Sequence, residues 1–116
     1  MKAMTEQRWE TFRKRFRKLF QLDPAADLPL ILFQIGMEHL AALPPKLSKE
    51  DKLRVMDIGL VALMVDLGLA AWKGEYDGCF PLYIVDKERL RAFGGQQRVI
   101  QEGLMRRYED VLSPPS

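Results

Sequence analysis

Apolar residues recur at helical spacing along most of the chain. Between residues 5 and 20 they follow each other mostly at steps of three or four, which is typical of the buried face of an amphipathic helix. These positions are Trp9, Phe12, Phe16, Leu19 and Phe20. Asp27 is a candidate N-cap for a second helix, which we expect to extend to Leu43 and to end at the following Pro44-Pro45.

A third helix is predicted to begin after Ser48, because Ser48 and Asp51 have the spacing of a capping box, and to end at Gly74. Its apolar residues form two nearly opposite faces, and both must be covered. One face has heptad spacing and consists of Val55, Ile58, Ala62, Val65 and Leu69. The helix is therefore either central in a closed bundle or paired with a copy of itself. We expect a homodimer whose interface includes the second helix or this heptad face.

The pattern changes between residues 75 and 85. Tyr76-Asp77-Gly78 indicates a turn, and Pro81 is incompatible with the interior of a helix. This composition predicts an irregular, extended connector or a single strand.

Two further helices are predicted after the connector. Asp86 is the N-cap of a short helix that ends at Gly94-Gly95, and the last helix covers residues 96–112 before a frayed tail at 113–116. The predicted fold class is therefore all-α, a compact bundle of four main helices plus one short helix with the third helix at its centre.

Composition narrows the function classes. The 116 residues are 47% hydrophobic and 29% charged, which fits one globular domain over residues 1–116 and excludes a disordered chain. One Cys and one His do not supply a zinc site or a redox dithiol, so we expect neither a metal nor a cofactor. The N-terminus lacks a secretory signal, which favours the cytoplasm. The apolar run at 58–72 is too short for a membrane span and contains Asp66.

His39 and Asp57 are the only candidate catalytic pair. Asp57 falls within an apolar face of the third helix, where a carboxylate needs a partner, a proton or water. His39 projects from the second helix, but an antiparallel arrangement about Pro45 brings Gln34 closer to Asp57. We therefore prefer structural hydrogen bonding, or plain exposure, to an acid–base pair, and expect no catalytic activity. Cys79 is expected to be a small, half-buried residue.

Charge is unevenly distributed along the chain. Residues 1–18 contain seven basic and two acidic residues, a net charge of +5, whereas the remainder has a net charge of −3. The basic surface candidates are Arg8, Arg13, Lys14, Arg15, Arg17 and Lys18. Such a helix can bind nucleic-acid phosphates, lie on an anionic membrane or dock on acidic protein surface, but a plain solvated basic face with the aromatic residues in the core is the preferred interpretation. We favour a helical interaction module and rank a nucleic-acid-binding protein second.

Several short motifs occur in a fixed order along residues 30–110. They are Ile35-Gly36-Met37-Glu38, Leu47-Ser48-Lys49-Glu50-Asp51-Lys52, Met56-Asp57-Ile58, Gly74-Glu75-Tyr76 and Asp77-Gly78-Cys79-Phe80-Pro81. The chain resembles a family of small uncharacterised bacterial proteins of the Bacteroidetes type. It departs from the family pattern at Asp57, where the pattern has His, and at Cys79-Phe80, where it has a single Trp. The resemblance implies a compact helical unit and no particular function.

Overall fold

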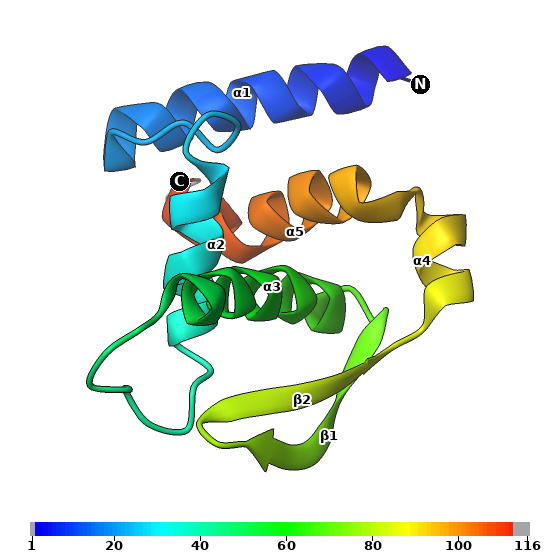
Figure 1. Cartoon of the computed structure of the whole chain (residues 1–116). Helices are drawn as coiled ribbons and strands as arrows, with labels where there is room; N and C mark the ends of the chain where they lie inside the picture. Colours follow the sequence, from blue (N-terminus) through cyan, green and yellow to red (C-terminus); the bar gives the residue numbers. More distant parts are fainter. Residues whose placement is uncertain (1, 113–116) are drawn as a thin grey trace.

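The structure is a computed structural model that describes residues 2–112, so the predicted frayed tail at 113–116 lies outside the described residues. Within this range it contains five helices and one two-stranded hairpin. Their order is α1 (Lys2–Phe20), α2 (Leu28–Met37), α3 (Lys49–Asp66), β1 (Ala70–Asp77), β2 (Phe80–Val85), α4 (Lys87–Phe93) and α5 (Gly95–Leu112) (Figure 1). Helices make up 64% of the structure, which confirms a mainly helical fold. The all-α prediction is nevertheless wrong, because the hairpin makes the fold α+β.

The third helix ends eight residues before the predicted Gly74. Gly68 follows α3 with a positive φ of 76°, and the Leu69 N–H donates to the Met64 carbonyl at 2.8 Å. This is the Schellman arrangement, which ends a helix and favours glycine at that position. The chain then leaves the helix axis at Leu69 and enters β1.

The hairpin replaces the predicted irregular connector. β1 and β2 are antiparallel, with Ala70 opposite Val85 and Trp72 opposite Tyr83, and an irregularity separates Trp72 from Tyr76. The predicted turn is present, and Gly78 within it has a positive φ of 62°. An isolated two-stranded hairpin is marginally stable in water. Here both strands contact α3, which supplies the missing packing surface.

Helix α2 ends at Met37 instead of the predicted Leu43, and the cause is a contact with the hairpin. The Ala41 N–H donates to the Cys79 carbonyl at 2.9 Å, so the segment after α2 bonds to the hairpin turn instead of continuing a helix. Cys79 itself is half-buried, as predicted.

Helices α2 and α3 cross at two glycines. A Cβ atom at Gly36 would overlap the Val55 carbonyl oxygen, and one at Gly59 would overlap the Leu32 carbonyl oxygen. The two backbones are therefore in direct contact, which only glycine permits at these positions.

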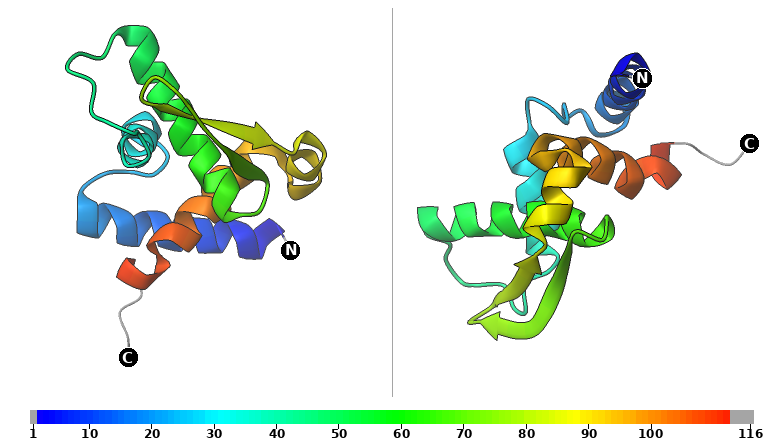
Figure 2. Two further views of the ribbon diagram at one scale, coloured as in Figure 1. Left: turned by 90° about the horizontal axis from the view of Figure 1, so that it is seen from below. Right: turned by 90° about the vertical axis from the view of Figure 1, so that its right-hand side faces the viewer.

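Helix α3 is the central element, because it contacts α2, α5 and both strands (Figure 1). Helix α1 packs across α5 on the side of the molecule remote from the hairpin (Figure 2). The core between these elements consists of Phe12, Phe16, Ile31, Leu32, Ile35, Ala62, Leu63, Met64, Leu69, Val99, Leu104 and Met105. No described helix is long and apolar enough to cross a membrane.

The heptad face predicted as a dimer interface is largely covered within the chain. Val55, Ile58, Ala62 and Leu69 are buried, and only Val65 is exposed. Helix α2 packs against Val55, while Ala62 and Leu69 belong to the core. Neighbouring elements of the same chain therefore cover most of the heptad face.

Candidate functional site

The six basic residues predicted to form a surface on α1 do not share one environment. Arg13 is half-buried, and its Nε and Nη2 atoms donate to the two carboxylate oxygens of Asp23 at 3.0 and 2.8 Å. These hydrogen bonds, followed by that from the Ala25 N–H, hold the pKa of Asp23 well below its usual range, and the same pair raises the pKa of Arg13. Arg13 therefore fastens α1 to the loop before α2.

The other five basic residues are exposed: Arg8, Lys14, Arg15, Arg17 and Lys18. Arg17 lies 4.0 Å from Asp23, and Arg8 lies 3.7 Å from Glu102 of α5. Arg15 has no ion pair among the described residues. The positive charge left for a partner is consequently greatest around Arg15 and the adjacent lysines.

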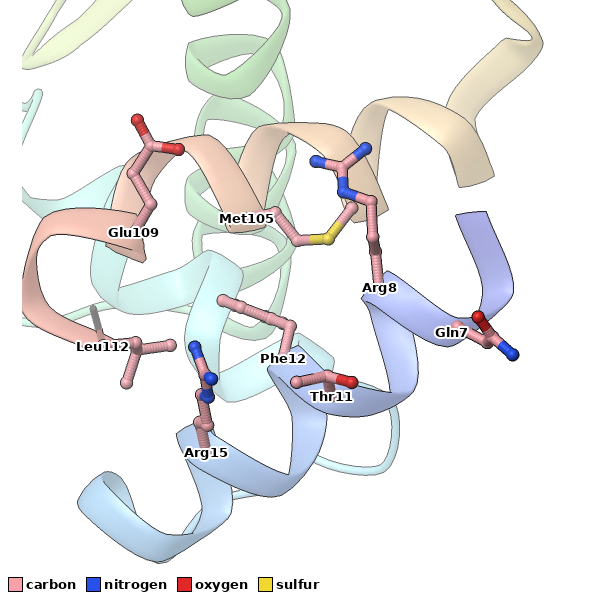
Figure 3. Close-up of a pocket in the computed structure, with 8 residues that line it drawn as sticks. All are labelled: Gln7, Arg8, Thr11, Phe12, Arg15, Met105, Glu109 and Leu112. Atoms are coloured by element: carbon pink, nitrogen blue, oxygen red, sulfur yellow. The ribbon is translucent and has the colours of Figure 1, made fainter. Parts of the chain in front are cut away.

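Arg8 and Arg15 border a groove between α1 and α5 with a volume of about 360 Å³. The two arginines extend from α1 towards α5 with Phe12 between them, and Met105 and Leu112 complete an apolar floor from the α5 side (Figure 3). Glu109 lies at the rim. We call this the basic groove. Its two arginines and apolar floor suit a ligand that combines carboxylates or phosphates with a hydrophobic side chain.

The sequence analysis did not predict that residues of α5 contribute to the basic groove. Met105 and Leu112 are two turns apart on α5, a spacing that indicates one helical face but not which helix covers it. The juxtaposition of α1 with α5 joins residues about a hundred positions apart, and no local signal specifies it.

The structure does not pair the predicted catalytic candidates. Asp57 is exposed on α3, and within residues 2–112 it has neither a hydrogen bond nor an ion pair with His39. The predicted Gln34–Asp57 hydrogen bond is also absent from the described residues, and both side chains are exposed. Plain exposure, one of the alternatives drawn from the sequence, is the outcome.

His39 instead contributes to a second pocket of about 270 Å³, between the end of α3 and the hairpin. We call it the aromatic pocket; it is lined chiefly by His39, Asp66, Trp72, Tyr76, Pro81 and Tyr83. Burial, and to a lesser extent Tyr76, raises the pKa of the Tyr83 phenol, which therefore stays neutral at physiological pH. Asp66 lies 3.7 Å from Arg107.

Potential metal ligands do not cluster in the described part of the chain. No group of three or more His, Cys, Asp or Glu side chains is placed to hold a metal ion there. No family model, curated protein or solved structure matches the chain.

Proposed function

We propose that this protein is a non-enzymatic interaction module whose basic groove binds an acidic, amphipathic helical segment of a partner protein. The observation that carries the proposal is the apolar floor between Arg8 and Arg15. A partner helix would place a leucine-like side chain against Met105 and Leu112 and its carboxylates beside the two arginines.

The apolar floor also ranks this function above nucleic-acid binding, which stays the alternative. Phosphate recognition requires cations alone, whereas base stacking requires exposed aromatic faces. Phe12 and Phe16 are buried in the core and are not available to stack on bases. Arg13 is engaged by Asp23, which reduces the free charge that a phosphate backbone would use.

The test uses a designed helical peptide with leucines along one face and glutamates beside them, and a scrambled peptide of the same composition. Fluorescence anisotropy should show roughly micromolar binding of the first peptide and much weaker binding of the second. Arg15→Glu should weaken binding about 3- to 10-fold, because it places a like charge at the rim. Lys14→Glu is the matched control, because this substitution changes the charge by the same amount at a residue that does not line the groove.

Equal losses in the two variants, or no preference for the amphipathic peptide, would refute the groove as the binding site. The nucleic-acid alternative is tested with duplex DNA and single-stranded RNA at low and moderate salt. Steep salt dependence, with a log–log slope of about −5 to −6 on duplex DNA, would overturn the ranking. The second condition is that replacing Lys14, Arg17 and Lys18 with Ala abolishes nucleic-acid binding while the circular dichroism spectrum is unchanged.

The predicted homodimer remains a proposal, now confined to α2. Leu30 on this helix is 47% exposed, and Phe33 one turn later is half-buried. An apolar pair on one exposed face supports an interface between two copies of the chain.

A further inference from the structure

The hairpin gathers aromatic side chains on the face that it turns towards the end of α3. The strand register places Trp72 directly opposite Tyr83 and Tyr76 opposite Pro81. Directly opposed residues share a face of a sheet, and so do Pro81 and Tyr83, which are two positions apart. All four residues line the aromatic pocket.

Two of these rings meet edge to face. Trp72 and Tyr76 have ring centroids 5.6 Å apart at an interplanar angle of 61°. The indole N–H of Trp72 donates to the Glu75 carbonyl at 3.3 Å, which fixes the orientation of the ring. Trp72 is 50% exposed and Tyr76 is 47% exposed. Large aromatic side chains left half open beside a cavity provide ring faces that a ligand can cover.

The charge at the mouth of the pocket is negative. Among the described lining residues Asp66 carries a formal charge, and its side chain is 44% exposed. Arg107 lies 3.7 Å from Asp66 through Nη1 but directs Nη2 to a hydrogen bond with Glu38. Asp66 is therefore only partly neutralised and can approach a cation held between the rings.

From these contacts we infer that the aromatic pocket binds an organic cation, specifically a quaternary or trimethylated ammonium group. The faces of Trp72, Tyr76 and Tyr83 carry negative electrostatic potential that attracts such a cation, and Asp66 adds a full negative charge. A trimethylammonium group is weakly hydrated and presents methyl groups to the rings, whereas a primary ammonium retains its water. The volume of about 270 Å³ suits a small ligand or a single side chain. This inference does not depend on the function of the basic groove.

The experiment compares choline and tetramethylammonium with 3,3-dimethylbutan-1-ol, the uncharged isostere of choline. Chemical shifts of the hairpin amides, followed in the full chain, should show saturable binding of both cations with dissociation constants of roughly 10 mM or tighter. The neutral isostere should bind at least about 5-fold more weakly, because it lacks the charge that the rings and Asp66 attract. Equal binding of isostere and cation, or no saturable binding of either cation, would overturn the inference.

Substitutions of residues that line the aromatic pocket test whether choline binds there. Trp72→Leu and Tyr76→Leu should each weaken choline binding about 5- to 30-fold, and Asp66→Asn should weaken it about 5-fold. Ile84→Ala is the matched control, because Ile84 is 59% exposed on the hairpin, neighbours Tyr83 and does not line the pocket. Loss of binding in Ile84→Ala equal to that in Trp72→Leu would refute the assignment. An unchanged circular dichroism spectrum in each variant separates lost contacts from lost folding.

Such a cation can come from a small molecule or from a trimethylated lysine side chain of a protein, and peptides distinguish the two sources. A short peptide that carries trimethyllysine is titrated beside the same peptide with unmodified lysine. Preference for the trimethylated peptide together with choline binding identifies a site that accepts a protein side chain. Choline binding without peptide binding identifies a small-molecule site. Both outcomes support a trimethylammonium site, whereas equal binding of the two peptides contradicts it.

Discussion

At the scale of single residues, the ion pair between Arg13 and Asp23 ties α1 to the loop before α2. Asp23 accepts two hydrogen bonds from Arg13 and one from the Ala25 N–H at 2.9 Å. All three favour the ionised carboxylate, and they keep the pKa of Asp23 below the ordinary value of 3.8. The folded state therefore binds a proton at Asp23 less readily than the unfolded state.

This difference predicts how stability depends on pH. The contribution of Asp23 is fully present above its ordinary pKa of 3.8 and is lost progressively as the pH falls below that value towards the lower folded pKa. Asp23→Asn should be less stable than the unmodified protein at pH 7, and the difference should narrow as the pH falls below about 4. Urea denaturation at pH 7 and at a pH below about 4 measures this difference in the free energy of unfolding. Asp57→Asn, a charge change at an exposed residue without a described ion pair, should produce no such narrowing.

At the scale of elements, the close crossing of α2 and α3 depends on Gly36 and Gly59. Any side chain at either position would meet a carbonyl oxygen of the other helix, and backbone atoms do not yield as flexible side chains do. The crossing holds α3 in place, and α3 in turn supports the hairpin and the aromatic pocket.

Alanine at these glycines should destabilise the fold although alanine is the better helix former. Gly36→Ala and Gly59→Ala should each lower the free energy of unfolding by at least about 2 kcal/mol, which outweighs the gain of about 1 kcal/mol in helix propensity. Gln34→Ala on the exposed face of α2 should change it by no more than about 0.5 kcal/mol. Denaturant titrations give these values, and a glycine variant as stable as the unmodified protein would contradict the close crossing.

At the scale of the whole molecule, the heptad face is largely covered within the chain, so we expect the homodimer interface to be formed by α2. One copy of the chain has a mass of 13.4 kDa. Light scattering at high protein concentration should give twice this mass. Leu30→Lys should give a folded monomer, because a buried unpaired lysine is costly at an interface. Leu43→Lys, at an exposed position in the loop after α2, should leave the mass unchanged. A monomeric unmodified protein would end the dimer proposal.

Features set by neighbouring residues were predictable from the sequence alone. The capping box of Ser48 and Asp51 is formed as predicted, with the Asp51 N–H donating to Ser48 Oγ at 3.1 Å. Asp86 caps α4 through the Arg89 N–H, and Gly94 ends that helix. The end of α3 at Gly68 was not predicted, although a glycine after a helical run is a common C-terminal signal. Gly74 carries the same signal, and residues 69–73 contain good helix formers, so composition did not distinguish them.

The features on which the two proposed sites depend were decided by tertiary structure. The Ala41–Cys79 hydrogen bond ends α2, and the Arg107–Glu38 pair leaves Asp66 partly free; these partners are 38 and 69 positions apart. Packing also brought α5 beside the basic helix and placed His39 near Asp66 instead of Asp57. The sequence by itself determined the caps, turns and helical faces, because these depend on groups within one or two turns of each other. Which faces meet depends on the lowest free energy of the whole packed chain, so the groove and the pocket emerged only in the folded structure.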